Sequence, residues 1–420
     1  MISHFRLVLS CCFASALSLS GAAQSDEILA ELQQLRAQQN ALAARISQIE
    51  NQLGLGQAVA QDRGVIRLSE PLQANSTGMP PQLSFGGDVR FRSEINRSNG
   101  LTPNRDRGVV RARLEGRYSI DPTWALSGRV VTGALDDPNT TDVTLGQFGD
   151  DLEIGLDLLY AERSFPSGRL LIGKHPNLFA TTDMVWDGDV SLQGLAGEWM
   201  RSLAPDLNIG LRGAFFVIEE SEAREDSFML GAQVFTSLRP TKRSNATFAL
   251  SHYSFDLDAI DSADLGDFRT NRRTPSGAYA SKFQITDVFG QLSIPTRSKD
   301  WPIRLTAQAA YNSGASASDS FAYTTGLALG DLASGGKKEI SYWYSKVEQD
   351  AILTAFSNDN IPLASGYELH NANTTLRISD QIQLDGSLFL YRDRRSLPSE
   401  QRLDQGNWQL RGRANLSFRF

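Results

Sequence analysis

The residues best suited to chemistry in this sequence are arginines, several of which lie two residues apart. Nine of them form the set of interest: Arg90, Arg92, Arg111, Arg113, Arg117, Arg129, Arg411, Arg413 and Arg419. An arginine stays positively charged at any ordinary pH, and its fork of donors fits a carboxylate or a phosphate. A row of arginines can therefore hold an anion and pass it along several sites. The interleaved Asp88, Glu94 and Glu115 favour a second interpretation, a structural network in which acids neutralise the arginines, and the sequence leaves both open.

Aspartates gather in two other stretches. Asp183, Asp187 and Asp189 surround a tryptophan in residues 176–188 and just beyond, where they serve either a charged site or turn formation. A second group lies in residues 256–267, at a spacing that fits no EF-hand loop. We interpret it as a solvated acidic loop, with a divalent-cation site as the alternative.

Catalysis has little support in the sequence. The motifs Gly-x-Ser-x-Gly and His-Glu-x-x-His are both absent, and Ser251 and His252, as neighbours in a strand, point in opposite directions. The only cysteines are Cys11 and Cys12, inside a segment that we expect to be removed. The formal net charge of -7 argues against a nucleic-acid partner. We therefore predict neither an enzyme nor a cofactor or metal site.

Arginines at alternate positions require strands, which place successive side chains on opposite faces. In the first such segment Leu83, Phe85 and Phe91 share one parity and the arginines share the other. About sixteen segments follow this period-2 pattern: 83–96, 107–120, 123–135, 151–164, 169–175, 189–200, 206–218, 227–238, 244–256, 281–294, 302–312, 320–331, 338–349, 366–378, 382–392 and 407–420.

The connections between these segments alternate in length. Short ones, such as Asp121-Pro122 and Ser379-Asp380, alternate with mostly longer ones, such as 257–280 and 350–365. An even strand number, with short turns at one end and long loops at the other, is typical of a bacterial outer-membrane barrel. A soluble all-β sandwich is the alternative, but it has no reason to sort its loops in this way. We predict an all-β, transmembrane antiparallel β-barrel over 83–420, whose closure makes the last strand a neighbour of the first and gathers the arginines on one interior wall.

Three shorter regions precede the barrel. Residues 1–23 have the pattern of a secretory signal peptide, with a lipoprotein signal at the cysteines as the alternative. Residues 24–56 predict a short α-helical coiled coil, with seam positions Ile28, Leu32, Leu35, Gln39, Leu42, Ile46, Ile49 and Leu53. An amphipathic helix lying on its own domain is the other interpretation. Residues 57–82, which hold several Gly and Pro, predict a linker.

The order of these features resembles the "putative porin" family with an N-terminal periplasmic coiled coil. The resemblance rests on residues 85–92 (FGGDVRFR), on Gly173-Lys174 and on residues 186–189 (WDGD). It implies passive diffusion of small hydrophilic solutes and ions through a homotrimer in the outer membrane, in contact with lipid and lipopolysaccharide. The loop carrying Asp183, Asp187 and Asp189 would fold inward and oppose the arginines. The C-terminal Phe420 resembles the signal that the barrel-assembly machinery recognises.

Two functions therefore remain. The first is a porin whose arginine-rich lumen prefers anions weakly, a phosphate-selective pore being one version of it. The second is a non-conducting anchor or adhesin barrel with a periplasmic coiled-coil tether.

Overall fold

The computed structural model describes residues 82–98, 103–134, 136–146, 148–149, 151–241, 243–298, 300–330, 332, 336–397 and 406–420. The predicted signal peptide, the coiled coil with its eight seam residues and nearly all of the predicted linker lie outside these residues. Gln82, the last predicted linker residue, already belongs to the first strand.

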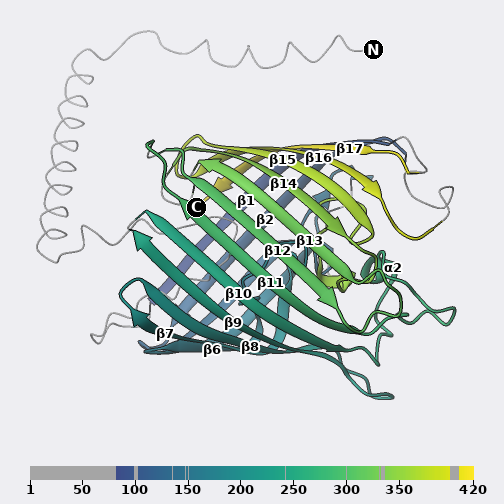
Figure 1. Ribbon diagram of the computed structural model, residues 1–420, viewed down its shortest axis with the longest axis horizontal. Helices are drawn as coiled ribbons and strands as arrows, with labels where there is room; N and C mark the ends of the chain where they lie inside the picture. The colour runs from purple at the N-terminus through teal and green to yellow at the C-terminus, as the bar shows by residue number, and fades with distance from the viewer. Residues whose placement is uncertain are drawn as a thin grey trace, which may run out of the picture. The chain divides into compact units, whose positions relative to one another are not determined.

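The described residues form one antiparallel sheet that closes on itself (Figure 1). Its sixteen long strands are β1 (Gln82–Arg97), β2 (Arg105–Ser119), β3 (Trp124–Thr132), β5 (Ile154–Phe165), β6 (Gly168–Pro176), β7 (Ser191–Ala204), β8 (Leu207–Glu219), β9 (Ser227–Thr241), β10 (Ser244–Asp256), β11 (Phe283–Ile294), β12 (Ile303–Asn312), β13 (Phe321–Gly330), β14 (Lys338–Val347), β15 (Tyr367–Arg377), β16 (Ile382–Asp393) and β17 (Gln409–Arg419). Each predicted segment overlaps one of them, which confirms the predicted fold class.

Three short elements were not predicted. The two-residue strand β4 (Val143–Thr144) pairs with β2, beyond the point where β3 stops pairing with it. A one-turn helix, α2 (Leu265–Phe268), and a 3₁₀ turn, η2 (Thr354–Phe356), lie in the loops after β10 and β14. Among the described residues, no helix is long and apolar enough to cross a membrane.

The seam of the barrel joins β1 to β17. The register places Arg92 opposite Asn415 and Glu94 opposite Arg413. Beyond the last strand, Phe420 continues the pairing: the Gly87 amide donates to the Phe420 carbonyl at 3.0 Å, and the Phe420 amide donates back at 3.1 Å. Gly87 is required here, because a Cβ at this position would lie 2.3 Å from the backbone oxygen of Arg113 and 2.7 Å from Cζ of the Phe420 ring.

The outer face of the barrel is apolar and exposed, as a face in contact with lipid should be. Phe85, Leu211 and Tyr311, from three different strands, are 68%, 51% and 52% exposed and have the parity predicted for the lipid side. The interior differs from one side to the other. Polar and charged residues cover it on β17, β1, β2 and β3, whereas a large apolar cluster fills it along β10, β11 and neighbouring strands.

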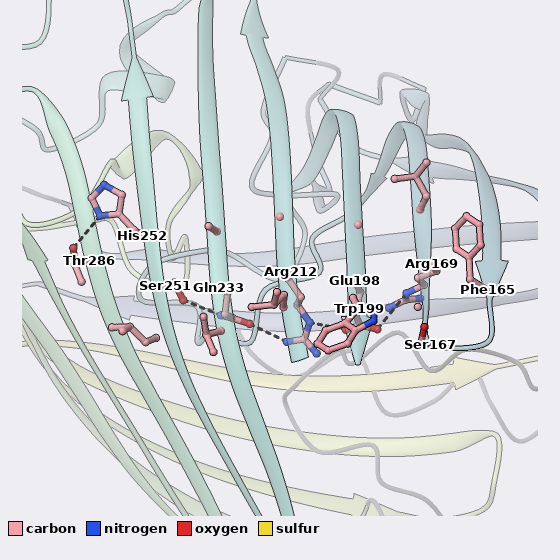
Figure 2. Close-up of a pocket in the computed structure, with 18 residues that line it drawn as sticks. Phe165, Ser167, Arg169, Glu198, Trp199, Arg212, Gln233, Ser251, His252 and Thr286 are labelled. Atoms are coloured by element: carbon pink, nitrogen blue, oxygen red, sulfur yellow. Dashed lines mark hydrogen bonds and ion pairs between the residues drawn. The ribbon is translucent and has the colours of Figure 1, made fainter. Parts of the chain in front are cut away.

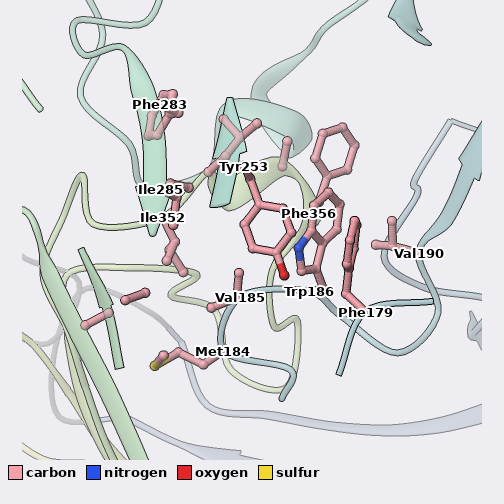
Figure 3. Close-up of a cluster of buried hydrophobic side chains, with 14 of the residues drawn as sticks. Phe179, Met184, Val185, Trp186, Val190, Tyr253, Phe283, Ile285, Ile352 and Phe356 are labelled. Carbon is pink, nitrogen blue, oxygen red and sulfur yellow. The ribbon is translucent and has the colours of Figure 1, made fainter. Parts of the chain in front are cut away.

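This apolar cluster forms because two long loops fold into the barrel (Figure 3). Phe179, Val185 and Trp186 come from the loop between β6 and β7, and Phe356 comes from the loop between β14 and β15. They pack against inward side chains of the strands, of which Tyr253 is fully buried. The packed loops lie against one side of the interior, and the arginine-bearing strands face them from the other side.

Candidate pore and constriction

Four neighbouring strands, β17, β1, β2 and β3, present the predicted arginines on the interior face. Their pairing places Arg90 opposite Arg111, and Arg92 opposite Asn415, in adjacent strands. Arg111, Arg129, Arg411 and Arg413 are buried, and Arg90, Arg92, Arg113 and Arg117 are partly buried. Arg419 is exposed at the end of β17. We refer to the first eight, together with Arg107 of β2, as the arginine wall.

Carboxylates between the arginines hold the middle of the wall together. Asp88 bridges two strands, because its two oxygens accept from Nη2 of Arg111 and Nε of Arg113, each at 2.7 Å. Asp142, from the segment between β3 and β4, pairs with Arg90 and lies 2.6 Å from Nη1 of Arg92. Each acid thus neutralises part of a pair of guanidinium groups.

Glu94 performs the same function at the seam. Its oxygens accept from Nε of Arg107 and Nε of Arg413, both at 2.7 Å, and Nε of Arg411 lies 3.9 Å away. Only 3% of Glu94 is exposed. A carboxylate so buried requires these cations, because an unpaired charge at this position would be strongly destabilising.

The remaining arginines of the wall pair with β5. Nη2 of Arg117 lies 3.1 Å from Glu162, and Nε of Arg129 donates to Asp157 at 2.6 Å. The acids of β5 were not predicted as partners. A bulge in β5 leaves Asp157 unpaired between Leu158 and Leu156, the partners of Arg129 and Val130, and so shifts the register between the two strands. That shift changes which side chains of β5 point inward.

The loop of residues 177–190 is fixed inside the barrel by two glutamines of the strands. Gln233 of β9 accepts from the Ala180 amide at 2.9 Å and donates to its carbonyl at 3.0 Å. Gln308 of β12 accepts from the Thr182 amide at 2.8 Å. The inward course implied by the family resemblance is therefore present.

Gln233 also belongs to a row of interior polar side chains on β7 to β10 (Figure 2). Glu198 accepts from Nε of Arg212 at 2.6 Å, Nη1 of Arg212 donates to Gln233 at 2.9 Å, and Gln233 donates to Ser251 at 2.8 Å. His252 lies on the opposite face of β10, where its Nδ1 is 2.9 Å from the Thr286 hydroxyl. Ser251 and His252 thus point apart, as predicted.

A second inward loop, residues 348–366, packs on the first and was not predicted. The Asp187 amide donates to the Phe356 carbonyl and the Asn358 amide to the Asp183 carbonyl, both at 2.8 Å. The rings of Trp186 and Phe356 stack at 5.8 Å between centroids, with 15° between their planes. The two loops therefore form one packed unit.

Arg269, from the loop after β10, anchors this unit. Its guanidinium donates to three backbone carbonyls of the second loop: Thr354 at 3.2 Å, Ser357 at 2.8 Å and Asn358 at 2.8 Å. Because one rigid guanidinium group donates to three backbone carbonyls, it fixes the path of the second loop across the barrel.

The loops and the arginine wall meet through side chains. Nη1 of Arg113 lies 3.3 Å from Asp189. Arg411 donates to the Asn360 carbonyl at 2.9 Å, and Arg413 donates to the side-chain oxygen of Asn360 at 2.6 Å. These contacts join the inward loops to the arginine wall, at the place where we predict the constriction. A cavity of about 360 Å³ adjoins it, bordered in part by Asp189.

The three predicted constriction acids lie in different surroundings. Asp189 pairs with the arginine wall, and Asp183 is exposed. Asp187 is buried between the two loops, where burial and then the neighbouring Asp183, Asp359 and Asp189 raise its pKa well above the usual value. Burial also raises the pKa of Asp359 in the second loop.

Comparison with known families supports this description. Residues 92–286 match the model of a family described as "Putative porin", which confirms the family predicted from the sequence. No curated protein matches the chain in sequence. A solved structure of Pseudomonas putida OprB at high pH is 12% identical, with a TM-score of 0.55, and the match covers 80% of this chain and 94% of that one.

Two further solved structures are similar. Salmonella typhi OmpF in complex with daunomycin is 9% identical, covers 80% of this chain and 97% of its own, and has a TM-score of 0.49. The loop-L8 deletion mutant of OmpT, an outer-membrane protein of Vibrio cholerae, is 10% identical, with coverages of 81% and 99% and a TM-score of 0.46. The family match over residues 92–286 and the closed antiparallel barrel together support an outer-membrane porin.

Proposed function

We propose that this outer-membrane porin lets small hydrophilic solutes and ions diffuse passively past its arginine wall, with a weak preference for anions. The observation that carries the proposal is the balance of charge on the wall. Nine arginines share six carboxylates in ion pairs: Arg90, Arg92, Arg107, Arg111, Arg113, Arg117, Arg129, Arg411 and Arg413 with Asp88, Glu94, Asp142, Asp157, Glu162 and Asp189.

Nine guanidinium groups and six carboxylates leave an excess of three positive charges on the wall. Glu115, on the same face of β2, reduces this excess to two. The raised pKa values of Asp187 and Asp359 limit the negative charge that the opposing loops contribute. A small positive excess favours anions over cations without binding one solute tightly. The proposal therefore specifies no single solute, and phosphate is only one candidate.

The predicted constriction is also compatible with a channel, because the ends of arginine side chains make the contacts between the wall and the loops. The Arg113, Arg411 and Arg413 side chains can rotate without disturbing the strands that carry them. The same contacts support the alternative function, a non-conducting anchor or adhesin, since in this structure they join the loops to the wall. The Ser251 and His252 side chains point to opposite faces, which supports transport over a hydrolytic role.

We also propose the assembly implied by the sequence. The heptad seam at residues 28–53 would hold a homotrimer together in the periplasm. Phe420, at the seam between the first and last strands, would be the residue read by the barrel-assembly machinery. Lipid and lipopolysaccharide would surround the apolar outer face.

Reconstitution into a planar bilayer under a salt gradient tests the function. We expect stable conductance steps and a reversal potential on the anion side. The double variant Arg411→Gln/Arg413→Gln should move that potential toward zero or beyond. The control, Arg304→Gln, removes an interior arginine of β12 that pairs with Glu339 at 2.7 Å, and should have little effect. A cation-selective wild type would overturn the anion preference, and the absence of any conductance would favour the anchor.

A further inference from the structure

A cluster of aromatic and charged side chains lies on the outer face of the barrel, at the ends of β14 to β17 that are joined by the long loops. Tyr342 and Tyr344 of β14 have the parity of the exposed Ile340. Glu368 of β15, Arg392 of β16 and Trp408, just before β17, lie on the same face, by the pairings Tyr344↔His370 and Glu368↔Arg392. We call these residues, with His370, Lys346 and Arg394, the outer-rim cluster.

The cluster is held together by specific contacts. Arg392 donates to Glu368 from Nε at 2.9 Å and from Nη2 at 2.6 Å, and the Tyr344 hydroxyl donates to the same residue at 3.1 Å. The Arg392 guanidinium lies 4.5 Å from the centre of the Trp408 ring. His370 contacts the Tyr342 hydroxyl through Nδ1 at 2.6 Å, and its ring lies 5.2 Å from Trp408. The aromatic rings and Arg392 are therefore positioned in advance of any ligand.

The charge of the cluster is positive. Lys346 is opposite Glu368 in the register, and Nε of Arg394 lies 3.8 Å from the same carboxylate. Three cations thus surround one acid, and the Arg394 side chain is 46% exposed. The nearby Glu348 accepts a hydrogen bond from the Phe321 amide of β13. Cations on the lipid side of a barrel strand are destabilising near the bilayer midplane, but their cost is small near the interface.

The position of the cluster along the barrel axis indicates which part of the membrane it contacts. Aromatic residues from β12 and β13, Tyr311, Phe321 and Tyr323, continue the band of rings at this end of the barrel, as in the girdle at a membrane interface. Because long loops face the outside of the cell, this is the interface of the outer leaflet. The lipid there is a phosphorylated glycolipid. Arginine forks fit phosphate oxygens, and exposed aromatic rings offer a surface for sugar rings.

We propose that the outer-rim cluster binds the phosphorylated disaccharide headgroup of lipopolysaccharide, with Arg394 and Arg392 on a phosphate and Trp408 and Tyr342 against the sugars. The proposal rests on the outer-membrane location in the proposed function. It does not depend on whether the barrel conducts, because the cluster lies on the outer face, away from the arginine wall.

Native mass spectrometry of the full-length protein in detergent tests this proposal, with diphosphorylated lipid A as the probe. We expect bound lipid A on the wild type and at least about tenfold weaker retention on Arg392→Gln/Arg394→Gln. The matched control is Arg163→Gln. Arg163 also faces outward and lies over the rings of Trp124 and Phe165, at 5.1 and 5.3 Å, but at the end of the barrel with the short turns. It should retain lipid A like the wild type.

Additional measurements distinguish lipid A from other phosphate-containing ligands, and distinguish lost binding from misfolding of the variant. Dephosphorylated lipid A and phosphatidylglycerol should bind more weakly than diphosphorylated lipid A, and millimolar inorganic phosphate should not displace it. Arg394→Gln alone keeps the Arg392–Glu368 pair and should already weaken retention if the double variant fails to fold. Conductance of the variants should equal that of the wild type. Equal retention by Arg394→Gln and wild type, equal loss in Arg163→Gln, or displacement by free phosphate would overturn the proposal.

Discussion

Replacing Arg269 by Met tests whether the second inward loop sets the width of the channel. Methionine keeps an unbranched side chain of moderate length but removes the guanidinium that donates to the carbonyls of Thr354, Ser357 and Asn358. A hydrogen bond to a charged group contributes about 1.5 to 3 kcal/mol. After water replaces part of what is lost, we expect the docked position of the loop to lose on the order of 3 to 5 kcal/mol.

A loss of this size increases the population of the undocked loop by a factor of about 10² to 4 × 10³, because each 1.4 kcal/mol is a factor of ten. The barrel itself should remain intact, since its strands are paired around the whole circumference and Arg269 lies in a loop. Single-channel recording should show larger conductance steps and more frequent transitions between conductance levels than in the wild type.

The matched control is Arg273→Met in the same loop. Arg273 donates to the Gly277 carbonyl of its own loop at 2.9 Å and lies over the Phe268 ring at 4.1 Å. Its replacement should leave the conductance unchanged. If Arg269→Met forms a folded barrel of wild-type conductance and noise, the second loop either does not limit passage or does not depend on Arg269, and the reasoning fails.

Two further predictions concern charge at the constriction. Glu94→Gln removes the carboxylate shared by Arg107 and Arg413, so the reversal potential should move further toward the anion side; a move toward cations would contradict the assigned charge balance. Asp187 has a folded-state pKa raised by burial, so its contribution to docking is present at low pH and is lost as pH rises from about 4 through that raised value. Conductance noise should therefore increase with pH in the wild type and increase less in Asp187→Asn, in which the buried Asp359 still titrates; equal pH dependence in both would contradict the assignment.

The strands were predictable because burial differs so strongly between their two faces. On β17, Arg411, Arg413 and Asn415 are buried inside, whereas Leu410 and Phe418 are exposed outside, so the period of two is visible without other information. The pairing between individual acids and arginines was harder to predict from the sequence. The Arg129–Asp157 pair depends on a bulge, and a one-residue shift in register reverses the faces of a strand.

The second inward loop was missed because loop sequences were interpreted from length and polarity alone, yet the strands carried a usable signal. On β10 and β11 both faces are apolar: Phe248 and Val288 are exposed to lipid, while Tyr253, Phe283 and Phe289 point inward and are buried. A continuous apolar inner face is unfavourable in contact with water, so these strands favour an apolar partner inside the barrel. Among the described residues the long loops supply it, and the strands that keep polar interiors, β17 to β3, mark the side that the loops leave uncovered. A search for strands apolar on both faces would therefore have located the packed half of the barrel from the sequence, and with it the wall that lines the channel.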